Sequence, residues 1–126
     1  KGAPVTAWLS NVTFDCADAA RLAGFWSEVL GRPLATTPAP SEDFASIGTL
    51  RHAAEDAPRW LFVKVPEARP PTKNRMHVDL AAADREAEVA RLVALGATRL
   101  ADQEMYGLRW TVMQDPEGNE FCVAQE

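Results

Sequence analysis

The sequence contains two copies of one pattern, and this repeat limits the folds that the chain can adopt. In the first copy, an alternating stretch at residues 11–15 runs into a helix-like stretch that ends at Gly31. In the second copy, residues 77–80 run into a similar stretch that ends at Gly96. A repeat of about half the chain length indicates two copies of one supersecondary unit. We therefore expect a functional site where the two copies face each other.

Each copy carries the local signals of a strand followed by a helix. Alternating apolar and polar residues predict the strand, Asp18 or Asp84 is placed to cap the helix, and a Leu-Gly pair ends it. Further alternating stretches give each half the order β-α-β-β-β. In the first half we expect a helix between Asp18 and Gly31 and strands at 8–15, 33–37, 44–50 and 59–65. In the second half we expect a helix at 84–95 and strands at 76–80, 97–101, 109–114 and 120–125.

A proline-bearing linker at residues 66–75 separates the two copies. The length of 126 residues fits one domain with a single core. We therefore expect one domain over residues 1–126, with module one at about 8–66 and module two at about 76–126.

Charge and composition exclude several classes of protein. A net charge of −5 argues against a nucleic-acid partner, which requires a basic face to neutralise phosphates. No apolar run approaches the roughly 20 residues that span a membrane, so no membrane partner is expected. Two cysteines, Cys16 and Cys122, are too few for a disulfide framework, which favours a reduced, cytoplasmic protein.

The first helix closes with FWSEVLG at residues 25–31, and the turn before the last expected strand is DPEGN at residues 115–119. With these motifs, the repeated unit resembles the vicinal-oxygen-chelate superfamily, which contains glyoxalases, bleomycin-resistance proteins and dioxygenases. Residues 73–80 and 110–123 resemble, more narrowly, the small glyoxalase-like proteins of actinobacteria. The resemblance implies an α+β fold in which two βαβββ modules form a curved mixed sheet around a cup-shaped ligand cavity. It also implies a homodimer.

The same resemblance implies where a metal would bind. Metal-dependent members place ligands on the first and last strands of each module; here these positions hold Asn11, His77, Phe62 or Lys64, and Cys122. A divalent metal needs three or four converging N or O ligands, and only His77 is a good one. We therefore expect no cofactor. The alternative is a divalent metal such as Zn, Mn, Ni or Fe, held by His77 with Glu120 or Cys122.

The aromatic residues of the strand at 59–65 suggest what the cup binds. Trp60, Phe62 and Lys64 alternate and so share one face, which by the resemblance lines the cup. A flat apolar wall suits a planar molecule held by stacking and a few hydrogen bonds. The alternative is that these rings fill the core or a subunit interface. The remaining candidate ligand-binding residues are polar or small: Asn11, Thr13, Asp15, His77, Asp79, Glu120 and Cys122.

Two functions follow from these residues. The first is a metal-independent protein that holds an aromatic or polycyclic metabolite or antibiotic in the cup, as in resistance by sequestration. The second is a lyase or isomerase acting on a small carbonyl or hydroxylated substrate, with His77 as the acid or base. Cys122 stands where a glyoxalase-I-type isomerase needs a metal-binding carboxylate, so we favour small-molecule binding. Cys122 itself is expected to fill a tight strand position.

Overall fold

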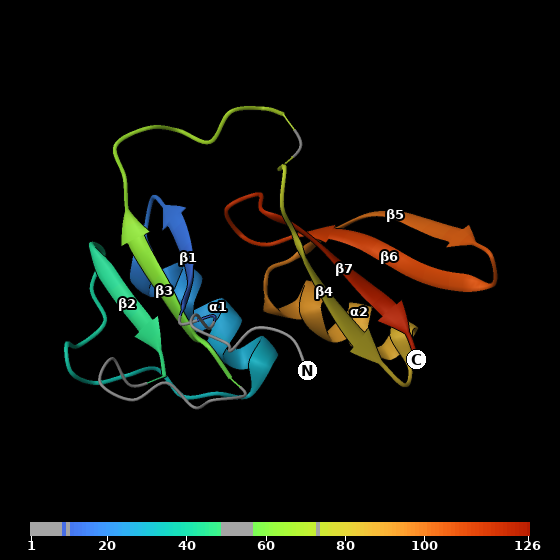
Figure 1. The fold of residues 1–126 in the computed structure, drawn as a ribbon, viewed down its shortest axis with the longest axis horizontal. Helices are drawn as coiled ribbons and strands as arrows, with labels where there is room; N and C mark the ends of the chain where they lie inside the picture. Colours follow the sequence, from blue (N-terminus) through green and yellow to red (C-terminus); the bar gives the residue numbers. More distant parts are fainter. Residues whose placement is uncertain (1–8, 10, 49–56, 73) are drawn as a thin grey trace, which may run out of the picture. The chain divides into compact units, whose positions relative to one another are not determined.

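The computed structural model in Figure 1 describes residue 9 and residues 11–48, 57–72 and 74–126. Residues 8, 10, 49 and 50 of the expected strands, and Lys73 of the expected linker, lie outside the described residues. The chain divides into two compact units, unit 1 (Lys1–Pro66) and unit 2 (Glu67–Glu126). The division falls where the proline-bearing linker begins, and the described residues of each unit form one helix and one β-sheet.

Unit 1 consists of β1 (Asn11–Cys16), α1 (Ala19–Leu30), β2 (Phe44–Ile47) and β3 (Arg59–Lys64). Its sheet has the order β1-β3-β2, with β1 parallel and β2 antiparallel to β3. The prediction of a strand at 33–37 is wrong. This stretch forms only a single bridge, between Leu34 and Ile47. Pro33 begins this stretch and Pro38 follows it, and neither has an N–H to donate to a ladder.

Helix α1 begins and ends at the residues that the sequence predicts. The carboxylate of Asp18 accepts a hydrogen bond from the N–H of Arg21 at 3.2 Å, which satisfies one of the donors of the first turn. Gly31 adopts the left-handed conformation at φ 64°, and its N–H bonds to the carbonyl of Ser27. A residue with a Cβ is disfavoured in that conformation, so glycine ends the helix at low cost.

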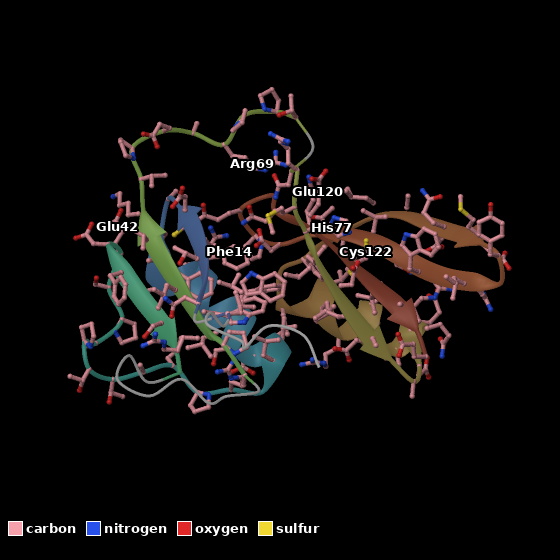
Figure 2. All side chains as sticks on the ribbon, in the orientation of Figure 1. Phe14, Glu42, Arg69, His77, Glu120 and Cys122 are labelled. Carbon is pink, nitrogen blue, oxygen red and sulfur yellow. The ribbon has the colours of Figure 1, made fainter. Side chains whose placement is uncertain are left out.

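Four aromatic rings form the core of unit 1. The Phe14 ring centroid lies 5.8 Å from that of Trp26, 5.5 Å from Trp60 and 5.2 Å from Phe62. Trp26 on α1 lies 5.2 Å from Trp60 on β3, so the rings join the helix to the sheet. Phe62 is 0% exposed and Trp26 is 1% exposed. Figure 2 labels Phe14 within this cluster. These separations are in the range at which aromatic pairs attract each other.

Unit 2 consists of β4 (Val78–Ala82), α2 (Arg85–Leu95), β5 (Thr98–Met105), β6 (Leu108–Gln114) and β7 (Glu120–Gln125). The sheet has the order β4-β7-β6-β5, in which β4 and β7 are parallel and the other pairs antiparallel. The predicted α+β architecture of strands and helices is therefore confirmed. Among the described residues, no helix is long and apolar enough to cross a membrane.

Strand β5 is longer than the sequence indicates, because it ends at Met105 rather than near 101. Tyr106 and Gly107 form the turn to β6, with φ values of 53° and 79°. Two positive φ values in a two-residue loop are typical of a tight hairpin, which lets the ladder run up to the turn. All residues of β5 are exposed. Its sequence therefore lacks the alternation that marks a half-buried strand.

A buried carboxylate sets the turn before β7. Asp115 is 3% exposed, and its Oδ1 accepts hydrogen bonds from the backbone N–H groups of Glu117 and Asn119, both at 2.9 Å. The side-chain amide of Asn119 also donates to Oδ2 at 2.9 Å. These bonds satisfy backbone groups that the sharp turn leaves without ladder partners. The turn thereby fixes where β7 begins.

A buried arginine fastens α2 to the sheet. Arg85, 5% exposed, donates from Nη1 to Oγ1 of Thr111 at 2.5 Å and to Oδ1 of Asp102 at 3.2 Å. The pKa of Asp102 is lowered, first by its hydrogen bond to Thr111 and then by its bond to Arg99. Because Thr111 reaches α2, the odd-numbered residues of β6 face the helix, and the even-numbered residues face the other side.

We predict that Phe62→Ala lowers the free energy of unfolding by about 3–5 kcal/mol, because it empties the centre of the aromatic core. Chemical denaturation followed by near-ultraviolet circular dichroism measures this loss. The matched control is Lys64→Ala, two residues along the same strand face, where the exposed pair with Glu42 is screened by solvent and contributes little. A loss for Phe62→Ala no larger than that of the control would contradict its place in the core.

We predict that Asp102→Asn flattens the dependence of stability on acid pH. The pKa of Asp102 is lower in the folded protein than in the unfolded chain, where it is about 4. The ionised side chain therefore stabilises the fold above about pH 4, and this contribution is lost as the pH falls through the lower pKa of the folded state. The melting temperature of the wild type should therefore fall more steeply than that of the variant between about pH 5 and pH 2. Parallel curves for the two proteins would refute this role.

Candidate functional site

An open pocket of about 650 Å³ lies on the sheet of unit 2. Its volume falls within the range of small-molecule sites, about 300–1,000 Å³. The walls come from both apolar and polar side chains and from the chain end: His77, Asp79, Gln103, Leu108, Arg109, Trp110, Val112, Cys122, Ala124, Gln125 and Glu126. On β6 the inward pocket residues Trp110 and Val112 are even-numbered, so the pocket occupies the face of the sheet opposite α2.

Strand pairing brings these residues together from distant parts of the sequence. Asp79 on β4 is paired with Cys122 on β7, and Cys122 with Val112 on β6. In the next row, Ala124 is paired with Trp110. Side chains of directly paired residues lie next to each other on one face of a sheet. The register of the central strands therefore places Cys122 beside Asp79, with Trp110 one row away.

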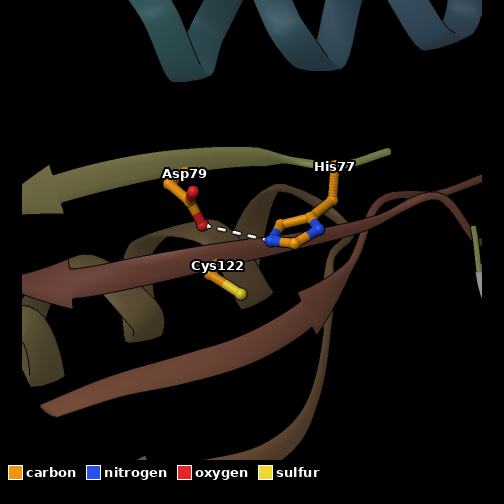
Figure 3. Close-up of side chains that lie close together, drawn as sticks. All are labelled: His77, Asp79 and Cys122. Atoms are coloured by element: carbon orange, nitrogen blue, oxygen red, sulfur yellow. Dashed lines mark ion pairs between the residues drawn. The ribbon is translucent and has the colours of Figure 1, made fainter. Parts of the chain in front are cut away.

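Three side chains with metal-binding atoms meet at one end of this pocket. A nitrogen of His77, a carboxylate oxygen of Asp79 and the sulfur of Cys122 all lie within 4.8 Å of one another, as Figure 3 shows. His77 Nε2 and Asp79 Oδ1 are 3.4 Å apart. His77 precedes β4 and lies two residues before Asp79, so both point to the same face. The side chain of Asp79 is 68% exposed, whereas Cys122 is 9% exposed.

In unit 1 the rings of Trp60 and Phe62 fill the core, which was the alternative to the expected ligand-binding wall. Asn11, Thr13 and Asp15 on β1 are paired with odd-numbered residues of β3. Trp60 and Phe62 therefore lie on the opposite face of the sheet from these three residues, where they pack against Trp26 of α1. Alternation correctly groups Trp60, Phe62 and Lys64, but it does not show which of the two faces the helix covers.

Lys64 shares that face at its exposed end and is paired with a carboxylate. Its ammonium group lies 2.5 Å from Oε2 of Glu42, and this hydrogen bond raises the pKa of Lys64. The pair lies at the surface of unit 1, as the label of Glu42 in Figure 2 indicates. The structure therefore brings Lys64 to a surface ion pair and the two rings to the core.

Glu120 has structural partners that the sequence did not indicate. Its Oε1 accepts a hydrogen bond from the N–H of Asn74 at 2.7 Å and lies 3.5 Å from Nη2 of Arg69. Arg69 also donates to Oδ1 of Asn74 and to the carbonyl of Thr72. Glu120 thus holds the linker against the beginning of β7. Arg69 lies 51 residues away, and no local pattern predicts this pairing.

Sequence reasoning missed the residues of β6 that line the pocket, Trp110 above all. The signal that could have found them is the turn at 115–119, which joins β6 to β7 and so sets their register. Counting outward from that turn pairs Gln114 with Glu120, Val112 with Cys122 and Trp110 with Ala124. The even positions of β6 then share a face with Cys122.

The sequence matches the model of the glyoxalase-like domain family over residues 11–124. The chain belongs to this family. A search among curated proteins finds no significant match. Many solved structures share the fold.

A glyoxalase/bleomycin resistance protein/dioxygenase family enzyme from Burkholderia phytofirmans PsJN has a TM-score of 0.72 and 21% identity, over 94% of this chain and 98% of that one. Lactoylglutathione lyase from Agrobacterium tumefaciens has a TM-score of 0.63 and 16% identity, over 97% and 95%. The bleomycin-binding protein from bleomycin-producing Streptomyces verticillus has a TM-score of 0.60 and 15% identity, over 98% and 99%. At these identities the similarity establishes the fold alone.

The resemblance to the vicinal-oxygen-chelate superfamily implies a divalent metal as one alternative, so the donors of unit 2 must be compared with what such ions require. Calcium and magnesium take oxygen ligands almost exclusively, and the sulfur of Cys122 does not suit them. Zinc accepts sulfur, imidazole nitrogen and carboxylate oxygen together, and three protein ligands are typical where a further position stays open. The set His77, Asp79 and Cys122 fits zinc in its chemistry. A bound zinc ion would act as a Lewis acid that polarises a ligand oxygen.

We predict that Glu120→Ala destabilises the fold by about 1–3 kcal/mol, because it leaves the N–H of Asn74 without its acceptor. Thermal and chemical unfolding measure the loss. Glu120→Gln is the matched control, since its amide carbonyl can still accept that bond and should retain most of the stability. If both variants keep wild-type stability and only ligand affinity changes, Glu120 contacts the ligand instead.

Proposed function

We propose that this protein binds a planar, largely apolar small molecule in the pocket of unit 2. The observation that carries the proposal is the position of Trp110, which is half-buried in the pocket wall with Leu108 and Val112 beside it. A large ring partly open to solvent in a concave site can stack on a flat ligand. By contrast, the packed rings of Trp26 and Phe62 in unit 1 have no exposed surface to offer.

Polar groups around the wall can orient such a ligand. Gln103 and Arg109 line the pocket with Trp110, while His77 and Asp79 line it beside Cys122. A mainly apolar pocket with a few placed polar groups is the usual design of small-molecule sites. We infer that the ligand is an aromatic or polycyclic metabolite or antibiotic with hydrogen-bonding groups at its edge. The stacking contribution of Trp110 does not depend on a metal.

Binding without turnover is supported by the comparison with the bleomycin-binding protein of Streptomyces verticillus, which was solved with copper(II)-bleomycin. That protein shares the fold and binds bleomycin. Sequestration of a toxic compound needs only affinity and a shaped pocket. We therefore propose sequestration as the role of the pocket, in the reducing interior of the cell, where Cys122 remains a thiol.

A second candidate function is catalysis with His77 as acid or base, favoured by the position of Asp79. A carboxylate oxygen 3.4 Å from the imidazole can orient the ring, as a neighbouring polar group orients the catalytic base in many enzymes. Lactoylglutathione lyase of Agrobacterium tumefaciens has the same fold. The reaction would be a lyase or isomerase step on a small carbonyl or hydroxylated compound.

We predict that Trp110→Ala weakens the binding of planar aromatic compounds about 5-fold to 150-fold, as expected for a lost stacking interaction of about 1–3 kcal/mol. Binding is measured by calorimetry with a hydroxyanthraquinone and a flavonol. Leu100→Ala is the matched control, because this exposed apolar residue on β5 is not part of the pocket wall. Unchanged affinity in Trp110→Ala would refute the proposal.

The His77→Asn variant separates the two candidate functions. If the protein only binds its ligand, the variant should change affinity modestly, and neither protein should convert the compound. If the protein is an enzyme, product formed by the wild type should disappear in His77→Asn while Trp110→Ala retains a residual rate. Mass spectrometry of the bound compound after incubation distinguishes these outcomes.

A further inference from the structure

We propose that the pocket of unit 2 selects elongated ligands, which are linear fused ring systems of three or four rings that lie along β6. Leu108 and Met105, at the tip of the β5–β6 hairpin, cover the far end of such a ligand and so determine how many rings bind well. The inference rests on the function proposed above, because it starts from a ring stacked on Trp110. It adds the length and direction of the ligand and two residues that select for them.

The pocket face of the sheet is arranged in three rows of side chains. The rows are set by Val112, Trp110 and Leu108, the even-numbered residues of β6 that line the pocket. An antiparallel strand rises about 3.4 Å per residue, so neighbouring rows lie about 7 Å apart and the outer rows about 14 Å apart. A single ring covers only one of these rows. A linear fused ring system is therefore needed to reach from the first row to the third.

The row of Val112 ends in polar groups. Cys122, the partner of Val112 on β7, is also paired with Asp79 on β4. His77 lies beside Asp79, and both side chains line the pocket. A carboxylate accepts hydrogen bonds, and an imidazole can donate or accept them. The hydroxyl or carbonyl edge of the ligand therefore lies in this row, and the remaining rings extend away from it along β6.

The middle row combines a large ring with a small neighbour. Trp110 is paired with Ala124 on β7 and with Gln103 on β5, and all three residues line the pocket. Ala124 carries only a methyl group, so the sheet surface is low beside the indole. A flat ring can lie over Ala124 with its face against Trp110, which is the stacked arrangement that aromatic pairs favour.

The third row is apolar and exposed. Leu108 is 65% exposed, and Met105, its partner on β5, is 56% exposed. The ladder between β6 and β7 stops at Trp110, so β7 does not cover this tip, and Figure 1 shows the β5–β6 hairpin projecting from the rest of the sheet. Adjacent exposed apolar side chains that continue a pocket are typical of a ligand groove. The apolar end of a long ligand would remove both from water.

The test uses three probes that share a hydroxyl group beside a ketone and grow away from it. They are 8-hydroxy-1-tetralone, 1-hydroxyanthraquinone and 1-hydroxynaphthacene-5,12-dione, with two, three and four rings. Equilibrium dialysis against the whole chain measures their affinities. We expect the four-ring probe to bind at least about 10-fold more tightly than the two-ring probe, since each carbon group taken out of water raises affinity roughly 4-fold. Equal affinities for the three probes would overturn the inferred length.

Variants separate the third row from the general gain that larger apolar probes have. Leu108→Ala should weaken the four-ring probe at least about 5-fold and the two-ring probe less than about 2-fold, because only the longer probe reaches this row. Met105→Ala should act in the same direction. Both side chains are exposed, so circular dichroism should show an unchanged fold. Leu100→Ala is the matched control, an exposed leucine of β5 outside the pocket wall, and should bind every probe as the wild type does.

The outcomes distinguish the inferred length from the proposed function. If Leu108→Ala weakens all three probes equally, or none of them, while Trp110→Ala weakens them all, this inference fails and the proposed function stands. If Trp110→Ala binds all three probes normally, or the wild type binds none, the proposed function fails and the inference fails with it. If Leu108→Ala changes the mass in light scattering but no affinity, the hairpin tip is a contact between chains, and the inference fails.

Discussion

The register between β6 and β7 is the constraint on which the pocket depends. It is fixed by the carboxylate of Asp115, which is buried in the turn and accepts hydrogen bonds from the backbone N–H groups of Glu117 and Asn119. A slip of one residue would move every side chain of β7 to the other face of the sheet. Cys122 would then point at α2, and Phe121 would point into the pocket. The chemistry of the site therefore follows from the geometry of a five-residue turn.

The sequence predicts the fold well because the repeat, the helix caps and the turn are local signals. Asp18 and Gly31 bound α1 as expected, since each acts through the backbone of its own helix. The strand expected at 33–37 fails because prolines remove donors that a ladder requires. Strand β5 extends beyond its expected end because exposure on both faces removes the alternation that would reveal it.

The site was only partly predictable, because alternation defines two faces without saying which one is covered. His77, Asp79 and Cys122 were all identified as candidates, but their meeting depends on the pairing of β4 with β7, which joins residues far apart in the chain. The same uncertainty placed Trp60 and Phe62 in the ligand wall, although the contacts of α1 with β3 bury them. The pairing of Arg69 with Glu120 is equally non-local.

The alternation along β6 separates two kinds of position on one strand. Thr111 and Met113 are fully buried toward α2, so substitutions there alter folding before they alter anything else. Leu108, Trp110 and Val112 face the pocket and contribute less to the core. Drift at these positions can therefore change recognition at little cost to folding. A scaffold with this property can acquire new ligands by replacing a few residues, which makes β6 the natural strand to randomise in a library for altered specificity.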